Sequence, residues 1–208
     1  MLNRQGFDLW ADGYDKTVQL SEENNEYPFA GYKSILGTIF NEVMQKEHSS
    51  VLDIGFGTGV LTSKLYEKGH RIYGIDFSPK MIAIAQAKMP EAHLIEWDIS
   101  NGLPSFPEGI KFDSIISTYA LHHLTDEAKM SFIKQLMPLL AEDGNIFIGD
   151  VAFRTRKELE DCRANSLGYW DENEFYFVFD EIKKPLENHG RCEFQPISHC
   201  GGILVISQ

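Results

Sequence analysis

Residues Val51–Gly59 read Val-Leu-Asp-Ile-Gly-Phe-Gly-Thr-Gly, and this stretch decides the fold. An apolar run that contains one acid is typical of a buried strand, and three glycines at alternate positions indicate a tight loop after it. Helical spacing follows at once, with Val60, Leu61 and Leu65 on one face. Glycine accepts positive φ and carries no Cβ, so a ligand can approach this loop closely. The stretch therefore predicts a strand, a loop and a helix start that bind a nucleotide-like cofactor.

The spacing of the glycines separates two kinds of cofactor. The NAD fingerprint is G-x-G-x-x-G, followed about 20 residues later by an acid that binds the ribose. Here the glycines are Gly55, Gly57 and Gly59, so the third one comes a residue early. Acids also stand inside the first strand and at the ends of the next two strand-like runs, at Asp53, Asp76 and Asp98. Three acids in this order depart from the dinucleotide pattern.

Size and charge limit the classes of protein to consider. A chain of 208 residues with 43% hydrophobic residues fits one globular domain, and no apolar run approaches the length of a membrane span. The net charge of −12 opposes binding to nucleic acid, which needs basic patches. No signal peptide is visible, and Cys162, Cys192 and Cys200 are too scattered for a disulfide framework. We expect a cytoplasmic protein that is a monomer or a homodimer.

Strand-like runs alternate with helical patterns along most of the chain, which predicts a parallel sheet with helices on both faces. The expected strands are residues 51–54, 72–75, 94–97, 112–117 and 145–148. Ser78-Pro79 begins one helix, and Thr125 caps another that runs to about Leu140. The alternation stops at the end, where runs 192–197 and 203–207 follow each other across a short turn. Strands joined this way pair antiparallel.

The strand pattern divides the single domain, residues 1–208, into four parts. Residues 1–48 are expected to form a helical cap, 49–153 the cofactor-binding core, and 181–208 the last helix and the terminal hairpin. Residues 154–180 are expected to be an insertion that forms a lid or a substrate wall. Its aromatic residues could surround an acceptor or could seal a sheet edge, and they are Tyr169, Trp170, Phe175, Tyr176, Phe177 and Phe179.

The loop, the strand-end acids and the hairpin together resemble the class I S-adenosylmethionine (SAM)-dependent methyltransferases. The opening Phe7-Asp8-Leu9-Trp10-Ala11-Asp12-Gly13-Tyr14-Asp15 is similar to that of the YrrT-type small-molecule methyltransferases of bacteria. The resemblance implies a Rossmann-like α/β sandwich with a mostly parallel seven-stranded sheet. It also implies methyl transfer from SAM to a small molecule, with S-adenosylhomocysteine (SAH) as product.

The resemblance also implies a role for each cofactor-binding residue. Gly55 and Gly57 would lie against the methionyl and ribose parts, and Asp76 would accept hydrogen bonds from both ribose hydroxyls. Asp98 would accept a hydrogen bond from the adenine amino group, and the Ile99 N–H would donate one to the adjacent ring nitrogen. Phe77 and Met81 would flank adenine, and Thr118 would lie near the sulfonium. The alternatives are an acid that caps a helix at Asp76, a turn-forming acid at Asp98 and ordinary helix core at Met81.

The candidates for a catalytic group are less distinctive. Tyr14 is a candidate because the family's N-terminal helix folds over the cofactor, and His122 or His123 is a candidate general base. Adjacent histidines are expected to point in different directions, so no metal site is predicted. Asp53 is expected to brace the loop through backbone N–H groups. Two other functions stay open, namely a non-catalytic SAM- or SAH-binding sensor or partner protein, and an NAD(P)-dependent oxidoreductase.

Overall fold

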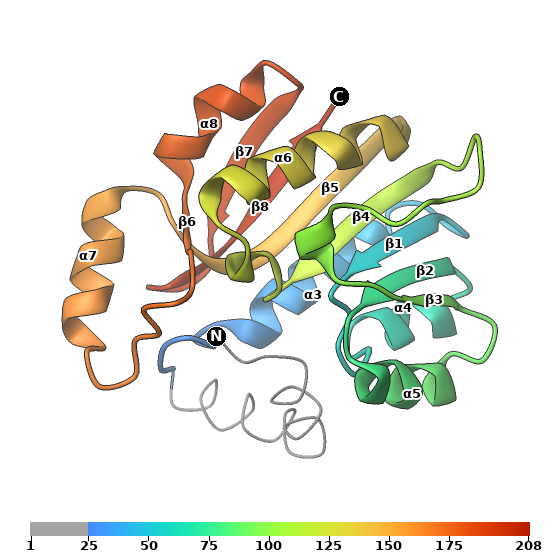
Figure 1. The fold of residues 1–208 in the computed structure, drawn as a ribbon, viewed down its shortest axis with the longest axis horizontal. Helices are drawn as coiled ribbons and strands as arrows, with labels where there is room; N and C mark the ends of the chain where they lie inside the picture. Colours follow the sequence, from blue (N-terminus) through green and yellow to red (C-terminus); the bar gives the residue numbers. More distant parts are fainter. Residues whose placement is uncertain (1–24) are drawn as a thin grey trace.

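The computed structural model describes residues 25–208, which form one mixed sheet with helices on both faces (Figure 1). The strands are β1 (Ser50–Ile54), β2 (Arg71–Asp76), β3 (His93–Glu96), β4 (Phe112–Thr118), β5 (Leu140–Phe153), β6 (Phe177–Val178), β7 (Arg191–Pro196) and β8 (Gly201–Ser207). The α-helices are α3 (Tyr32–Val43), α4 (Thr62–Glu67), α5 (Pro79–Lys88), α6 (Asp126–Leu136), α7 (Arg156–Asn165) and α8 (Phe179–Glu187). Short 3-10 helices are η1 (Ile99–Asn101), η2 (Leu121–His123) and η3 (Met137–Leu139).

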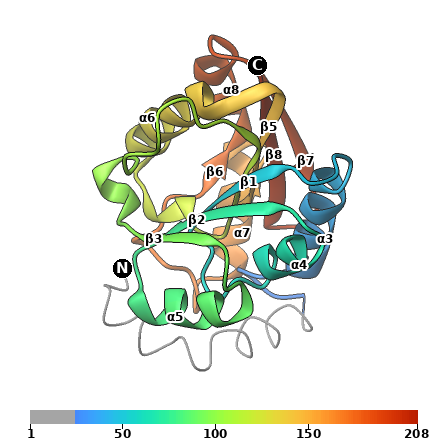
Figure 2. The ribbon, with the colours of Figure 1, turned by 90° about the vertical axis from the view of Figure 1, so that its right-hand side faces the viewer.

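The alternation of side chains along β1 explains the two-sided core. Val51 belongs to the apolar cluster that α3, α4 and α5 cover, whereas Leu52 and Ile54 belong to the cluster under α6 and α8. Figure 2 shows the sheet between these two groups of helices. Each helix contributes an apolar face, because burying it on the sheet stabilises both elements. The predicted α/β sandwich is therefore confirmed.

The order of the strands is β3-β2-β1-β4-β5-β8-β7. The strands β1 to β5 pair parallel with one another, while β8 lies between β5 and β7 and is antiparallel to both. The seven strands of this path match the predicted sheet with its terminal hairpin. The two-residue strand β6, which pairs with β5, adds an eighth. An antiparallel strand inside the order differs from the parallel sheet of NAD-binding folds.

Two boundaries differ from the sequence-based prediction. The strand expected at 145–148 is β5, which runs over 14 residues because it pairs with β4 from Leu140 and with β8 and β6 as far as Phe153. The helix expected to reach Leu140 ends at Leu136 and continues only as the 3-10 turn η3, which contains Pro138. Proline lacks the N–H that the next helical hydrogen bond needs.

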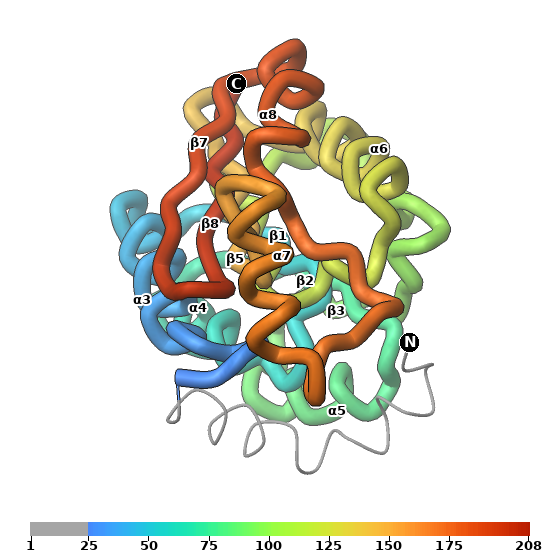
Figure 3. Tube along the Cα trace, turned by 90° about the vertical axis from the view of Figure 1, so that its left-hand side faces the viewer, coloured from blue at the N-terminus to red at the C-terminus, as the bar shows by residue number. Residues whose placement is uncertain are grey.

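The aromatic group in residues 154–180 divides between two roles. Figure 3 shows the chain leaving the sheet after β5, forming α7 and returning to α8. Phe177 and Phe179 are buried in the core below α6 and α8, so they seal the sheet. Trp170 and Tyr176 instead pack on Tyr27, with ring centroids 5.1 and 5.9 Å from that of Tyr27. Tyr169 is 85% exposed and contributes to neither.

Close packing of α3 on the sheet makes Gly149 intolerant of a side chain. A Cβ there would overlap Ile35 and lie 2.9 Å from Cδ1 of Ile39, so α3 would have to move. We expect Gly149→Ala to lower the free energy of unfolding by ~1–3 kcal/mol. The matched control is Gly37→Ala in α3, where a Cβ meets nothing within 4 Å and should stabilise the helix by ~0.5–1 kcal/mol. Equal melting temperatures of both variants in a thermal denaturation would contradict this packing.

Within residues 25–208, none of the helices has the length and apolar character required to traverse a lipid bilayer.

Candidate functional site

The glycine loop between β1 and α4 has the backbone that its sequence predicts. Gly55 has φ 71° and Gly57 has φ 55°, in the left-handed region that side chains rarely adopt. A Cβ on Gly55 would lie 2.5 Å from the Cβ of Ala120, so the loop packs tightly on the residue that follows β4. A Cβ on Gly57 would meet nothing within 4 Å, because this glycine faces open space. Gly55 is thus needed for packing, and Gly57 leaves room for a ligand.

Asp76 ends β2 and connects the glycine loop to the start of α5. Its Oδ2 accepts a hydrogen bond from the Gly57 N–H at 2.9 Å, and its Oδ1 accepts from the Ser78 N–H at 2.9 Å. The side chain is 6% exposed. A carboxylate oxygen has two lone pairs, so an oxygen that accepts from a backbone N–H can in addition accept from a ribose hydroxyl. The capping contact and the ribose role expected from the sequence are therefore compatible.

Asp98 follows β3 and caps η1, where its Oδ1 accepts a hydrogen bond from the Ser100 N–H at 2.8 Å. The turn-forming alternative is thus present at this position. Both Asp98 and Ile99 nevertheless line the same hollow as Asp76. The turn holds the Asp98 carboxylate at the rim of that hollow, where its other oxygen can accept a further bond.

A cavity of about 510 Å³ lies at the carboxyl ends of β1 to β4. All eight predicted cofactor-binding residues line it, and they are Gly55, Gly57, Asp76, Phe77, Met81, Asp98, Ile99 and Thr118. Its wall also carries four carboxylates, Asp53, Asp76, Glu96 and Asp98, and within residues 25–208 it contains no lysine or arginine. The volume suits one small ligand, and the charge favours a cationic one.

Asp53 differs from its expected role. Its carboxylate accepts a hydrogen bond from the Thr62 hydroxyl, and no backbone N–H bond to it is found in the described part of the chain. Its second oxygen, Oδ1, has no hydrogen-bond partner among those residues although it is buried in the cavity wall. Burial, opposed by the Thr62 bond and reinforced by Asp76, raises the pKa of Asp53 to about 7. A buried acid with an unused oxygen is a candidate group for binding a cation.

The end of β4 forms another wall of the cavity. Tyr119 has φ 52°, unusual for a residue with a side chain, and its N–H donates to the Gly149 carbonyl at 2.9 Å. Its ring contacts those of Phe29 and Tyr32, with centroids 5.2 and 5.3 Å away. The aromatic contacts bring α3 onto the cavity, so Tyr32 and Leu36 line it too. Residues in strained backbone often mark a functional site.

The two histidines lie closer together than expected. Their ring centroids are 4.2 Å apart, because η2 is a tight 3-10 turn, so the expectation of diverging rings is wrong. His122 is buried, with Nδ1 2.6 Å from Oδ1 of Asp150. Burial lowers the pKa of His122 while Asp150 raises it, and the net shift is upward. Burial and then His122 lower the pKa of His123 to about 3. Only His123 lines the cavity.

The predicted candidate Tyr14 and the N-terminal motif lie outside the described residues. Asp150 and Glu174, which lie beside the histidines, were not predicted from the sequence. Asp150 could have been found, because an acid inside the strand-like run of β5 repeats the pattern of Asp53 in β1. No sequence pattern marked Glu174 as a site residue, since it lies in a polar loop far along the chain from the histidines. Its place beside them depends on tertiary structure alone.

Comparison with known proteins agrees with this geometry. A family described as "Methyltransferase domain" matches residues 51–144. An uncharacterized methyltransferase of Geobacillus thermodenitrificans is 38% identical over 191 residues, which cover 88% of this chain and 86% of the relative. Another, from Bacillus cereus, is 40% identical over 196 residues, with 88% and 87% covered. The chain therefore belongs to this family of methyltransferases.

Solved structures show the same fold at low sequence identity. Magnesium protoporphyrin IX methyltransferase (ChlM) from Synechocystis PCC 6803, with bound SAH, superposes with a TM-score of 0.66 at 20% identity, covering 85% of this chain and 83% of that one. The DhpI–SAM–HEP complex gives a TM-score of 0.69 at 16% identity, covering 97% and 94%. The class I methyltransferase fold predicted from the glycine loop and the terminal hairpin is confirmed.

Proposed function

We propose that this chain is a SAM-dependent methyltransferase that acts on a small-molecule acceptor. The observation that carries the proposal is the charge of the cavity, which has four carboxylates and, within residues 25–208, no lysine or arginine in its wall. SAM carries a cationic sulfonium and an ammonium group, whereas NAD(P) carries a pyrophosphate. An acidic wall attracts the first and repels the second.

The residues present fit SAM at three points. The unpartnered Oδ1 of Asp53 would accept from the methionyl ammonium, and it is buried in the described part of the chain. The carboxylate of Asp76 would accept from both ribose hydroxyls, oriented by the N–H groups of Gly57 and Ser78. Asp98 and the Ile99 N–H would hold the adenine edge, with Phe77 and Met81 on its faces.

Bound SAM supplies a methyl group made electrophilic by the sulfonium. The protein's part is to hold the acceptor in line with the breaking bond, and positioning can contribute ~7–11 kcal/mol. Thr118 and Tyr119 at the end of β4 and His123 in η2 line the cavity and would face the acceptor. The cavity volume of about 510 Å³ supports a small molecule over a macromolecule, as does the net charge of −12.

The remaining expectations form part of the proposal. Residues 154–180 would supply a wall of the acceptor site, because Glu174 lies near both histidines while Trp170 and Tyr176 pack on Tyr27. Residues 1–48 would complete the cap, as α3 already lines the cavity. The protein would work in the cytoplasm as a monomer or homodimer.

The test is calorimetric titration with SAM, SAH and NAD in parallel, followed by a screen of thiols, amines, phenols and carboxylates for SAH release. We expect saturable binding of SAM and SAH alone and turnover of at least one acceptor. Binding of NAD alone would contradict the proposed cofactor. Binding of SAM and SAH with no transfer to any acceptor would favour a sensor over an enzyme.

A further inference from the structure

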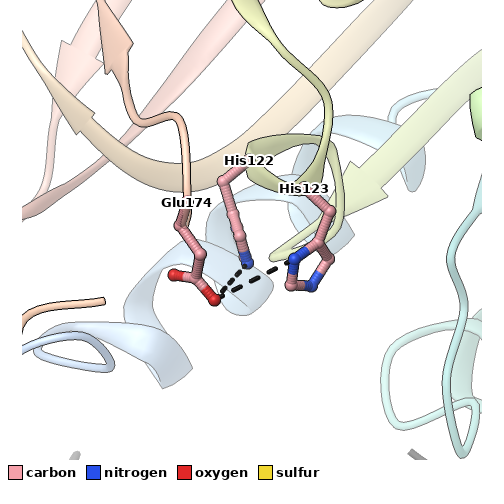
Figure 4. A group of neighbouring side chains, drawn as sticks. All are labelled: His122, His123 and Glu174. Atoms are coloured by element: carbon pink, nitrogen blue, oxygen red, sulfur yellow. Dashed lines mark ion pairs between the residues drawn. The ribbon is translucent and has the colours of Figure 1, made fainter. Parts of the chain in front are cut away.

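Three donor groups converge beside the cofactor cavity. His122 and His123 come from η2, and Glu174 comes from the loop between α7 and β6 (Figure 4). The Glu174 Oε1 lies 3.6 Å from Nε2 of His122 and 3.9 Å from Nδ1 of His123. One ligand atom from each residue lies within 4.8 Å of the other two. Two imidazoles and one carboxylate form a donor set that binds divalent transition metals.

Hydrogen bonds to other residues orient two of the three donor side chains, those of His122 and Glu174. The His122 Nδ1 lies 2.6 Å from Oδ1 of Asp150, which is fully buried and also accepts from the Val151 N–H at 2.7 Å. The hydroxyl of Tyr176 donates to Oε2 of Glu174 at 2.7 Å. Metal-binding histidines and carboxylates characteristically have such outer partners, which fix their direction and their tautomer. The same contacts leave Nε2 of His122 and Oε1 of Glu174 facing each other.

The contact between Nε2 of His122 and Oε1 of Glu174 is favourable only with a positive charge between the two atoms. If Nδ1 of His122 donates its proton to Asp150, Nε2 presents a lone pair to the Glu174 carboxylate. Two acceptors at 3.6 Å repel, and either a second proton on Nε2 or a metal ion between the two atoms removes that repulsion. Zinc bonds of about 2.1 Å imply donor separations of roughly 3.4 Å in a tetrahedron. The two Glu174 distances, 3.6 and 3.9 Å, exceed this by a few tenths of an ångström, and the widest separation in the group, within 4.8 Å, requires a larger side-chain adjustment.

We propose that Nε2 of His122, Nδ1 of His123 and Oε1 of Glu174 bind a divalent transition-metal ion such as Zn²⁺. Three protein ligands leave at least one position for another molecule, as in catalytic sites. His123 lines the cofactor cavity, and Glu174 lines a second cavity of about 1060 Å³. The ion would therefore stand between the two cavities, with its open position available to an acceptor.

The role of the ion in transfer rests on the proposed function, whereas its binding does not. An acceptor that binds through an O–H or S–H group would have its pKa lowered by the metal and would release the proton to water. The oxygen or sulfur then forms the bond to the methyl group while the bond between carbon and the sulfonium breaks. SAH and a neutral methylated product remain.

The test titrates chelator-treated full-length protein with Zn²⁺ by calorimetry and with Co²⁺ by visible absorption. The disrupting variants are Glu174→Gln, which keeps an acceptor for Tyr176, and His123→Gln. Glu172→Gln is the matched control, because this exposed acid of the same loop pairs with Arg163 at 2.7 Å. We expect one equivalent of Zn²⁺ in wild type and in the control, with affinity at least about 10–100-fold weaker in each disrupting variant.

Absence of saturable Zn²⁺ binding in wild type, or equal affinity in wild type and both disrupting variants, would overturn the metal site. Circular dichroism identifies a variant that fails to fold. If one disrupting variant is unfolded, the Zn²⁺ affinity of the other one tests the metal site. SAH titrated into the same samples separates the two proposals. Zn²⁺ binding without SAH binding would support the metal site and reject the proposed cofactor, and SAH binding without Zn²⁺ binding would do the reverse.

Discussion

Asp76→Ala is expected to weaken SAM and SAH binding by a factor of about 100 to 1,000. The carboxylate offers one oxygen to each ribose hydroxyl, and a hydrogen bond to a charged group contributes ~1.5–3 kcal/mol. Two such bonds, each near the lower end of that range, contribute ~3–4 kcal/mol, which corresponds to that change in the dissociation constant. The variant also removes the acceptor of the Gly57 and Ser78 N–H groups, so the glycine loop loses its connection to α5.

Two further variants test whether the weaker binding of Asp76→Ala comes from the lost carboxylate contacts. Asp76→Asn keeps one acceptor oxygen and should lose about half of the binding free energy that alanine loses. Glu91→Ala removes an exposed acid just before β3 and should bind SAH as wild type does. Calorimetric titration gives the affinities, and thermal melting confirms that each variant is folded. Wild-type affinity in a folded Asp76→Ala protein would refute the assigned ribose contact.

The cofactor side of the site could be predicted because its signals are local. A parallel strand places the residue at its carboxyl end on one edge of the sheet, so Asp76 and Asp98 had to meet near the glycine loop. The terminal hairpin could also be predicted from the sequence, because two strand-like runs without a helix between them must be antiparallel. The largest error in the predicted strand ends is at β5, because its length depends on its pairing with β4, β6 and β8.

The proposed acceptor side of the candidate site could not be predicted, because its residues come from distant parts of the chain. Tyr32 of α3 lines the cavity only because the helix packs on β4, β5 and β8. Glu174 reaches the histidines through the fold of a loop that has no periodicity. The directions of His122 and His123 follow from the 3-10 geometry of η2, which the sequence pattern does not distinguish from a helix start.

Asp53→Asn is expected to have opposite effects on stability and on cofactor binding. Burial raises the pKa of Asp53 to about 7, so near neutral pH the folded chain holds a carboxylate that is costly to ionise. Asparagine is neutral and nearly isosteric, and its amide oxygen can still accept from the Thr62 hydroxyl. The ligand-free variant should therefore be more stable than wild type, while SAM loses its partner for the ammonium group and binds about 10–100-fold more weakly.

The pH dependence distinguishes this cause from a change in packing. A folded pKa above the unfolded value gives stability that is present at low pH and is lost as pH rises through about 7. Between pH ~5.5 and pH ~7 wild type should lose ~2 kcal/mol relative to Asp53→Asn, at ~1.4 kcal/mol per pH unit, and little more above that range. For a chain of this size the melting temperatures should diverge by ~4–8 °C.

The measurement is thermal melting of wild type and Asp53→Asn at several pH values, with and without SAH. Without ligand, the variant's advantage in melting temperature should grow up to about pH 7 and then level off. Saturating SAH should reduce that advantage, because the methionyl ammonium compensates the buried charge only in wild type. A constant difference between the two proteins across this pH range would mean that Asp53 does not titrate there. An unchanged advantage in the presence of bound SAH would place the ammonium group elsewhere in the cavity.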